Sequence, residues 1–170
     1  MGRSRARGES GSVALVEIEL RGIERDEVAA AVALVVEGTL RDAREEDLAR
    51  LEDYWAAVLE TRARDGEVLV AIRDGEVVGM CQIVIFRHFQ HSGGRCAELE
   101  SVYVRGDVRG QGVGARMIAH AEDFARARGC YRVQLTSRHE RRDAHRFYER
   151  LGYLPVAQGY KKSLVEGHLA

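Results

Sequence analysis

The chain has few of the residues that cross-link or stiffen small proteins. Its 170 residues include one proline and three cysteines. The cysteines Cys81, Cys96 and Cys130 are odd in number, lie far apart and include no CxxC pair, so they indicate neither a disulfide framework nor a zinc site. We therefore expect a reducing, cytoplasmic setting and no bound metal.

Long hydrophobic runs are also missing. The longest run, from Val28 to Val36, covers about nine residues, whereas a helix needs about 20 apolar residues to cross a bilayer. The opening residues 1–12 are rich in Gly, Ser and Arg and have no apolar stretch of a signal peptide, so we expect a mobile leader there. The sequence predicts no membrane partner and a single domain over residues 13–170.

An excess of one charge sign is absent from the chain as a whole, because 26 Lys and Arg nearly balance 27 Asp and Glu. A nucleic-acid-binding domain normally has a strongly basic face, so the net charge of −1 argues against that class. Residues 13–60 hold 13 acidic and 5 basic residues, whereas residues 105–150 hold 11 Arg and 6 acidic residues. This asymmetry indicates either solvated helix faces or a polyanionic ligand on the C-terminal part, with a cationic ligand facing the N-terminal part.

The spacing of apolar residues predicts an alternation of strands and helices. The Asp74-Gly75 pair favours a two-residue hairpin turn within residues 66–86. We expect further strands over residues 13–20, 97–104, 131–137, 153–156 and 159–164, and helices over residues 24–37, 46–60, from 113 to about 128, and within 141–152. Because a strand, a helix and a strand follow one another from Ala97 to Ser137, that unit should join parallel neighbours. The sequence therefore predicts an α/β (α+β) fold with a mixed central sheet of about six to seven strands and helices on both faces.

Four glycines crowd residues 106–114, between a predicted strand and a predicted helix. At such a junction, unpaired N–H groups and the positive end of the helix dipole can bind a phosphate. A Walker A loop needs GK[ST], and a Rossmann fingerprint needs GxGxxG with an acidic residue about 20 positions later; both are absent. The spacing that is present is RxxGxG, formed by Arg109, Gly112 and Gly114.

Two stretches together resemble a known family. VYVRGDVRGQGVG, residues 102–114, and AHRFYERLGY, residues 144–153, are similar to the pyrophosphate-binding motif and the FYExxG helix of the GNAT superfamily of acetyl-CoA-dependent N-acetyltransferases. The resemblance is strong from residue 98 to residue 164 and covers the chain from residue 13 by the order of elements. It implies an acyltransferase with acetyl-CoA as the acetyl donor.

The resemblance also implies where acetyl-CoA would lie. The strand before the glycine cluster would splay from its parallel neighbour, and the pantetheine arm would pair with main-chain groups of Val102 and Val104 in the gap. The implied cofactor-binding residues are Val102, Tyr103, Val104, Arg109, Gly110, Gln111, Gly112, Val113 and Gly114. Many members have Asn three positions before Ala144, whereas this chain has Arg141, which would meet a phosphate or the acceptor instead.

Acetyl transfer to an amine needs a neutral amine, a polarised carbonyl and a proton for the departing thiolate. Tyr148 matches the family's tyrosine that is often proposed as the general acid. The alternative role for Tyr148 is that of an aromatic residue packed in the core. Glu98 and Glu100 share one face of a strand, and Glu100 matches the position of a water-mediated base in some members. The oxyanion would accept a hydrogen bond from the N–H of Val102 or Tyr103. Which carboxylate is the base stays open.

The expected acceptor is the primary amine of a small molecule. The last predicted helix and the ending GYKKSL are similar to a subgroup that includes aminoalkylphosphonate N-acetyltransferases. A protein N-terminus or lysine stays an alternative acceptor, and a non-catalytic acyl-CoA-binding module or interaction module of the same fold is the alternative class. A homodimer is also left open.

Two connections are expected to shape the acceptor pocket. One is the stretch that holds Phe86 and Phe89, and the other is residues 38–47 between the first two predicted helices. His88 and His91 in the first connection are expected to be solvated loop histidines rather than metal ligands.

Overall fold

The computed structural model describes residues 17–38 and 48–164. In the listing that follows, η marks a single 3₁₀ turn. The elements are β1 (Glu19–Gly22), η1 (Arg25–Glu27), α1 (Val28–Gly38), η3 (Leu48–Arg50), α2 (Leu51–Ala63), β2 (Glu67–Arg73), β3 (Glu76–Arg87), η4 (His91–Gly93), β4 (Arg95–Val104), η5 (Gly106–Val108), α3 (Val113–Ala127), β5 (Cys130–Leu135) and α4 (Arg142–Arg150).

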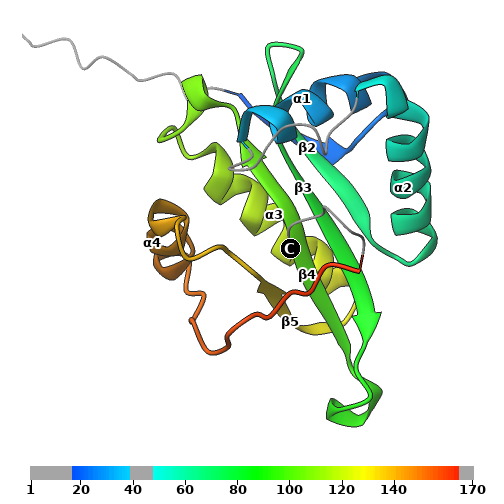
Figure 1. Cartoon of the computed structure of the whole chain (residues 1–170), viewed down its shortest axis with the longest axis vertical. Coiled ribbons are helices and arrows are strands. Elements are labelled where there is room, and N and C mark those ends of the chain that lie inside the picture. The colour runs from blue at the N-terminus through cyan, green and yellow to red at the C-terminus, as the bar shows by residue number, and fades with distance from the viewer. Residues whose placement is uncertain (1–16, 39–47, 165–170) are drawn as a thin grey trace, which may run out of the picture.

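The strands form one mixed sheet. In the described residues it has five strands in chain order, β1-β2-β3-β4-β5 (Figure 1). The first three junctions are antiparallel, whereas β4 pairs parallel with β5 through the crossover helix α3. The predicted α/β fold with a mixed sheet and a parallel pair is therefore confirmed.

Helices cover both faces of the sheet, as predicted. Strand β2 contributes side chains to hydrophobic clusters on both faces of the sheet, because successive residues of a strand point to opposite faces. Val68, Val70 and Ile72 pack in a cluster with α1 and α2, whereas Leu69 and Ala71 pack in a second cluster with α3. A continuous apolar run is what a strand buried on both faces requires.

The β2–β3 hairpin follows from its two turn residues. Asp74 and Gly75 have φ of 53° and 79°, the left-handed values that a primed turn needs at both central positions. The predicted hairpin is confirmed.

Strand prediction failed at the end of the chain. Residues 153–156 and 159–164 form no strand, so the described sheet has one or two strands fewer than expected. The backbone N–H of Tyr153 instead donates to the Tyr148 carbonyl at 3.0 Å, and Leu154 and Val156 are exposed. Alternating apolar residues form a strand only where a partner strand accepts their hydrogen bonds. The predicted leader and residues 13–16 of the first predicted strand lie outside the described residues.

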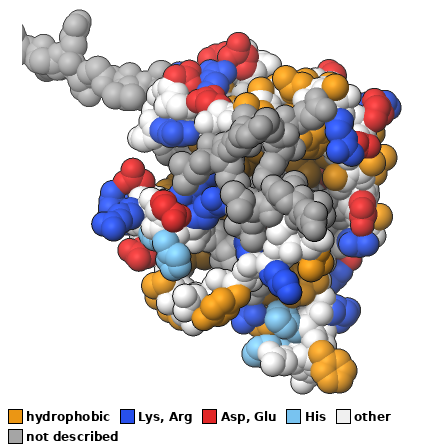
Figure 2. Space-filling view, viewed as in Figure 1, with side chains coloured by type: hydrophobic (Ala, Val, Ile, Leu, Met, Phe, Trp, Pro, Cys, Tyr) orange, Lys and Arg blue, Asp and Glu red, His pale blue; other side chains and the backbone are white. Residues whose placement is uncertain are grey.

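The arginine-rich part of the chain uses many of its charges within the protein. Arg105 pairs with Glu76 at 2.8 Å, and Arg126 pairs with Glu122 at 3.0 Å. The face seen in Figure 2 shows Lys and Arg side chains among Asp and Glu rather than a field of one sign. These contacts favour the interpretation of the asymmetry as solvated, paired surfaces.

Candidate active site

Strand β4 runs beyond its parallel partner. The β4–β5 pairing ends at Leu99 opposite Leu135, whereas β4 continues to Val104 and pairs there with β3. Among the described residues, no strand pairs with the backbone groups of this last section that point away from β3. The structure thus has an open strand edge at the level of Val102 and Val104.

A β-bulge interrupts the β3–β4 pairing at the same level. The register passes from Gln82 opposite Glu100 to Met80 opposite Tyr103, so two residues of β4 lie opposite one residue of β3. Ser101 in this bulge has φ of 51°, in the left-handed region. The bulge takes its backbone groups out of the regular ladder beside the open edge, where an N–H group can face a ligand.

The glycine cluster forms the turn into α3. Gly110 and Gly112 have φ of 76° and 83°, and Gly112 is the N-cap of α3. A Cβ atom built on either glycine would meet no other atom within 4 Å, so the surface beside the first turn of α3 is open. The first N–H groups of a helix lack partners within it. This turn therefore fits a pyrophosphate group.

Gly114 and Arg109 have contacts inside the protein. A Cβ on Gly114 would lie 3.3 Å from Phe147 Cζ and 3.6 Å from Val104 Cγ2, so this glycine lets α4 approach α3 closely. Arg109 Nε donates to the Val104 carbonyl at 2.8 Å, which ties the turn to the end of β4. Both residues therefore have a structural role in the turn, whether or not they also contact a ligand.

Gln111 and Val113 are also held by the protein. Gln111 Oε1 accepts from Arg73 Nη1 at 2.9 Å, and Gln111 Nε2 donates to the Asp107 carbonyl at 2.9 Å. Val113 is the first residue of α3, and its side chain is buried. Only their backbone groups are thus placed for a ligand.

Tyr148 lies on α4, on the α3 side of the sheet. Its ring packs against Phe147 and Tyr153 with centroid distances of 5.1 and 5.7 Å. Burial raises the pKa of Tyr148 to about 12, Cys81 contributes to this rise, and the charge of Arg141 opposes it. The phenol therefore keeps its proton at neutral pH, while its ring is also part of the core.

The two predicted base candidates have different surroundings. Glu98 Oε2 accepts from Gln134 Nε2 of β5 at 3.1 Å, whereas Glu100 lies beyond the last β4–β5 pair. Glu100 is exposed as a residue, yet desolvation by its neighbours raises its pKa, the Glu98 charge adds to the rise, and Lys161 opposes it. Of the two carboxylates, Glu100 is the one that lies on the open section of β4.

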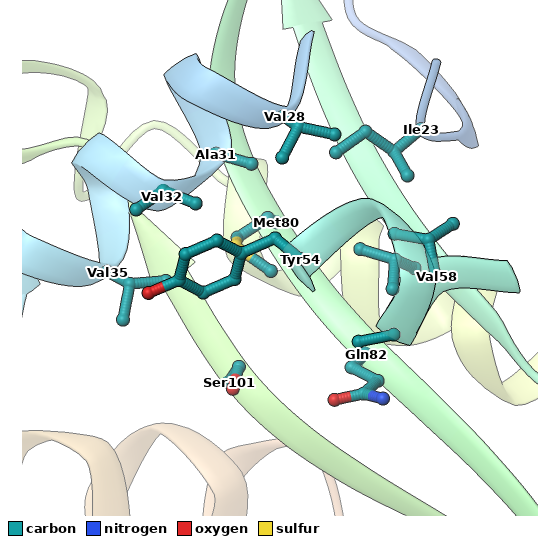
Figure 3. Close-up of a pocket in the computed structure, with 12 residues that line it drawn as sticks. Ile23, Val28, Ala31, Val32, Val35, Tyr54, Val58, Met80, Gln82 and Ser101 are labelled. Atoms are coloured by element: carbon teal, nitrogen blue, oxygen red, sulfur yellow. The ribbon is translucent and has the colours of Figure 1, made fainter. Parts of the chain in front are cut away.

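A cavity of about 190 Å³ lies beside this section, between the sheet and the helices α1 and α2 (Figure 3). Its walls include Val32 of α1 and Val58 of α2, and its floor includes Met80, Gln82 and Ser101. Sequence reasoning did not identify these residues. Gln82 was the residue that could have indicated this cavity from the sequence, because it is a polar residue within the apolar run of β3.

Arg141 connects two elements at the open end of β4. Its Nη2 donates to the Gly38 carbonyl at the end of α1 at 2.8 Å, and its guanidinium lies 5.8 Å from the centroid of the Tyr103 ring. These observed partners of Arg141 belong to the protein, although the sequence predicted a phosphate or the acceptor.

The connection with the two phenylalanines lies at the far tip of the β3–β4 hairpin (Figure 1). The His88 ring packs 5.1 Å from Phe86 and 6.1 Å from Tyr131, and Phe89 is fully exposed beside a separate hollow. None of these residues lines the cavity beside β4, and the expectation that this connection shapes the acceptor pocket stays a prediction. The other predicted contributor, residues 38–47, lies outside the described residues except for Gly38.

The described ranges, 17–38 and 48–164, offer neither a cluster of metal ligands nor a membrane-spanning helix. They contain no group of three or more His, Cys, Asp or Glu side chains that could hold a metal ion. No helix within them has the length and apolarity to cross a membrane.

Comparison of the sequence with known proteins points to one family. The sequence model of the acetyltransferase (GNAT) family matches residues 25–153. An aminoalkylphosphonate N-acetyltransferase of Salmonella typhimurium is 38% identical over 95 residues, which are 56% of this chain and 61% of that protein. A glucosamine 6-phosphate N-acetyltransferase of Trypanosoma brucei brucei is 30% identical over 142 residues, 82% of this chain and 90% of that protein.

Solved structures share the architecture. A transcriptional regulator from Bacillus halodurans C-125 superposes with a TM-score of 0.79 at 28% identity, over 87% of this chain and all of that one. The glucosamine-6-phosphate N-acetyltransferase from Arabidopsis thaliana gives a TM-score of 0.73 at 18% identity, over 88% of this chain and 99% of that one. The second likeness is one of fold alone.

Proposed function

Because this chain belongs to the acetyltransferase (GNAT) family, we propose that it transfers an acetyl group from acetyl-CoA to the primary amine of a small molecule. The observation that carries the proposal is the early end of the β4–β5 pairing at Leu99, beside the glycine turn into α3. This arrangement supports the proposal because an open strand edge, a glycine turn at the start of a helix and the carboxylate of Glu100 lie in one region of the molecule.

The backbone at this edge holds the donor. Main-chain groups of Val102, Tyr103 and Val104 bind the pantetheine arm, and the turn from Arg109 to Gly114 binds the pyrophosphate. The open space at Gly110 supports this placement, because a Cβ there would meet no atom of the protein. Acetyl-CoA, when bound, supplies the thioester whose acetyl group is transferred.

Side chains on the two faces of the sheet move the protons. Glu100 takes a proton from the acceptor ammonium, directly or through a water molecule, so that the neutral amine can attack in a ternary complex. The N–H of Val102 or Tyr103 stabilises the negative charge on the carbonyl oxygen. Tyr148 holds a proton on its hydroxyl that is available to the departing sulfur, because its pKa of about 12 keeps it protonated.

Small-molecule acceptors are supported by the names of the relatives. The two curated proteins compared above act, by their names, on an aminoalkylphosphonate and on glucosamine 6-phosphate. Both names describe small molecules with an amino group. We extend this class to the present chain.

A thiol-release assay tests the proposal. The purified chain is mixed with acetyl-CoA and a panel of small primary amines, lysine-containing peptides and peptides with a free N-terminus. We expect thiol release with at least one small amine and the acetylated amine by mass spectrometry. Binding of acetyl-CoA without turnover on any amine would assign the chain to the non-catalytic module class, and turnover on peptides alone would assign a protein acceptor.

A further inference from the structure

We propose that Gln82, on the floor of the cavity beside β4, and Glu100, opposite Gln82 in the β3–β4 pair, together bind the acceptor ammonium, and that the acceptor is a primary amine on a small apolar body. This inference rests on the proposed function, because it names the acceptor class of the same site.

The Gln82 amide has one orientation that its neighbour permits. Thr61 Oγ1 donates its single hydrogen to the Ala57 carbonyl at 2.8 Å, so toward Gln82 it can only accept. Gln82 Nε2 lies 2.8 Å from Thr61 Oγ1 and donates to it. The amide oxygen must therefore point away from Thr61. In Figure 3 this oxygen lies on the side of β4 and Ser101, and the amide nitrogen lies on the side of α2.

Glu100 presents its carboxylate on the same face of the sheet. It lies directly opposite Gln82 in the antiparallel register, and side chains of such a pair have their Cβ atoms about 5 Å apart. An ionised carboxylate and an amide oxygen only accept hydrogen bonds, whereas an ammonium group has three N–H donors. The pair therefore offers matching acceptors to a protonated amine, and the carboxylate can then take its proton.

The other residues that line the cavity determine which kind of group, attached to the amine, can enter it. The described residues that line the cavity include no charged side chain, and most of them are apolar, among them Val28, Val32, Val58 and Met80. A buried anionic group without a partner costs several kcal/mol, so these described residues disfavour a phosphate or phosphonate inside the cavity. The volume of about 190 Å³ exceeds that of an engineered cavity of about 150 Å³ that holds benzene. A short alkyl or phenyl body fits this space.

The first arm of the experiment compares acceptors. The kcat/KM values of butylamine, benzylamine and phenethylamine are measured beside those of 2-aminoethylphosphonate and glucosamine 6-phosphate, all at saturating acetyl-CoA. We expect the best apolar amine to exceed both anionic amines at least tenfold. A preference for either anionic amine would overturn the proposed acceptor class.

The second arm tests the amide oxygen. Gln82→Met keeps the length of the side chain and removes the acceptor, and we expect the KM for the best amine to rise at least tenfold with an unchanged KM for acetyl-CoA. Thr61→Val removes the hydroxyl that orients the amide and should raise the same KM in part, whereas Thr61→Ser keeps the hydroxyl and should restore it. An unchanged amine KM in Gln82→Met would overturn the role of Gln82.

A binding measurement separates this inference from the proposed function. Benzylamine is titrated calorimetrically into the wild-type chain and into Gln82→Met without acetyl-CoA. We expect binding to the wild type that weakens at least tenfold in the variant. Equal binding, or none to the wild type, overturns the inference even where acetyl transfer is observed, and absence of turnover with the expected binding pattern overturns only the proposed transferase activity.

Discussion

Leu99 of β4 and Leu135 of β5 are the last pair of the parallel junction, although β4 continues to Val104. Beyond this pair the edge of β4 is open and contains a bulge. The glycine turn into α3 follows directly after η5.

Substitution of Gly112 tests the pyrophosphate site. We expect Gly112→Ala to weaken acetyl-CoA binding by a factor of ten or more, because φ of 83° disfavours any L-residue and the new methyl group would fill the open space beside the helix start. Stability should fall by about 1 to 2 kcal/mol from the left-handed conformation alone. Calorimetric titration and thermal unfolding measure the two effects.

Gly129 supplies the matched control for that measurement. It follows the other end of α3, has φ of 71°, and a Cβ there would also meet no atom within 4 Å. Gly129→Ala should therefore lose a similar amount of stability and keep its affinity for acetyl-CoA. Equal affinities of the two folded variants for acetyl-CoA would show that the turn at Gly112 is not part of the binding site.

Removal of the Tyr148 hydroxyl tests the proposed general acid. Tyr148→Phe should lower kcat by about 10²- to 10⁴-fold where chemistry limits turnover, because that is the usual contribution of general acid catalysis. Affinity for acetyl-CoA should stay the same, since the ring and its packing against Phe147 are kept. The measurement is steady-state kinetics with the best amine.

Tyr153→Phe, which alters a neighbouring ring 5.7 Å away, should keep the wild-type kcat. A wild-type kcat in Tyr148→Phe would leave Tyr148 with a packing role only.

The pH profile of kcat/KM tests Glu100 as the base. Desolvation and the charge of Glu98 raise the pKa of Glu100, and Lys161 opposes this, so its charged form is lost at a higher pH than for an ordinary glutamate. Activity should fall as the pH drops through this raised value, and Glu100→Gln should lower the whole curve. Glu98→Gln removes the neighbouring charge, so the acid limb should move to lower pH. Superimposable profiles of all three proteins from pH 5 to 9 would exclude Glu100 as the base.

An ion pair away from the site predicts how stability depends on pH. Arg21 donates to both carboxylate oxygens of Glu27 at 2.6 and 2.8 Å, and the Glu24 N–H donates at 2.8 Å. The hydrogen bonds from Arg21 lower the pKa of Glu27, so its stabilisation is present above the unfolded pKa of about 4.3 and is lost as the pH falls through the lower folded value. Glu27→Gln should cost about 1 to 2 kcal/mol at pH 7. Urea unfolding at pH 7 and pH 3 checks this, and a cost that persists at pH 3 would assign the effect to packing.

Local sequence determined the parts of the fold that depend on single residues or short periods. Asp74-Gly75 encoded the hairpin turn because its left-handed backbone is a property of those two residues. The period of two placed Glu98 and Glu100 on one face, and Gly112 marked the start of α3. The family followed from the motifs around that glycine.

Tertiary structure decided what depends on residues far apart in the chain. Only the end of the pairing with β5 showed that Glu98 is engaged with Gln134 while Glu100 lies at an open edge. The cavity exists because α1, α2 and the strands β2, β3 and β4 meet, which no local pattern encodes. The absent last strands have the same cause, since a strand is stabilised by hydrogen bonds to a neighbour and not by its own sequence.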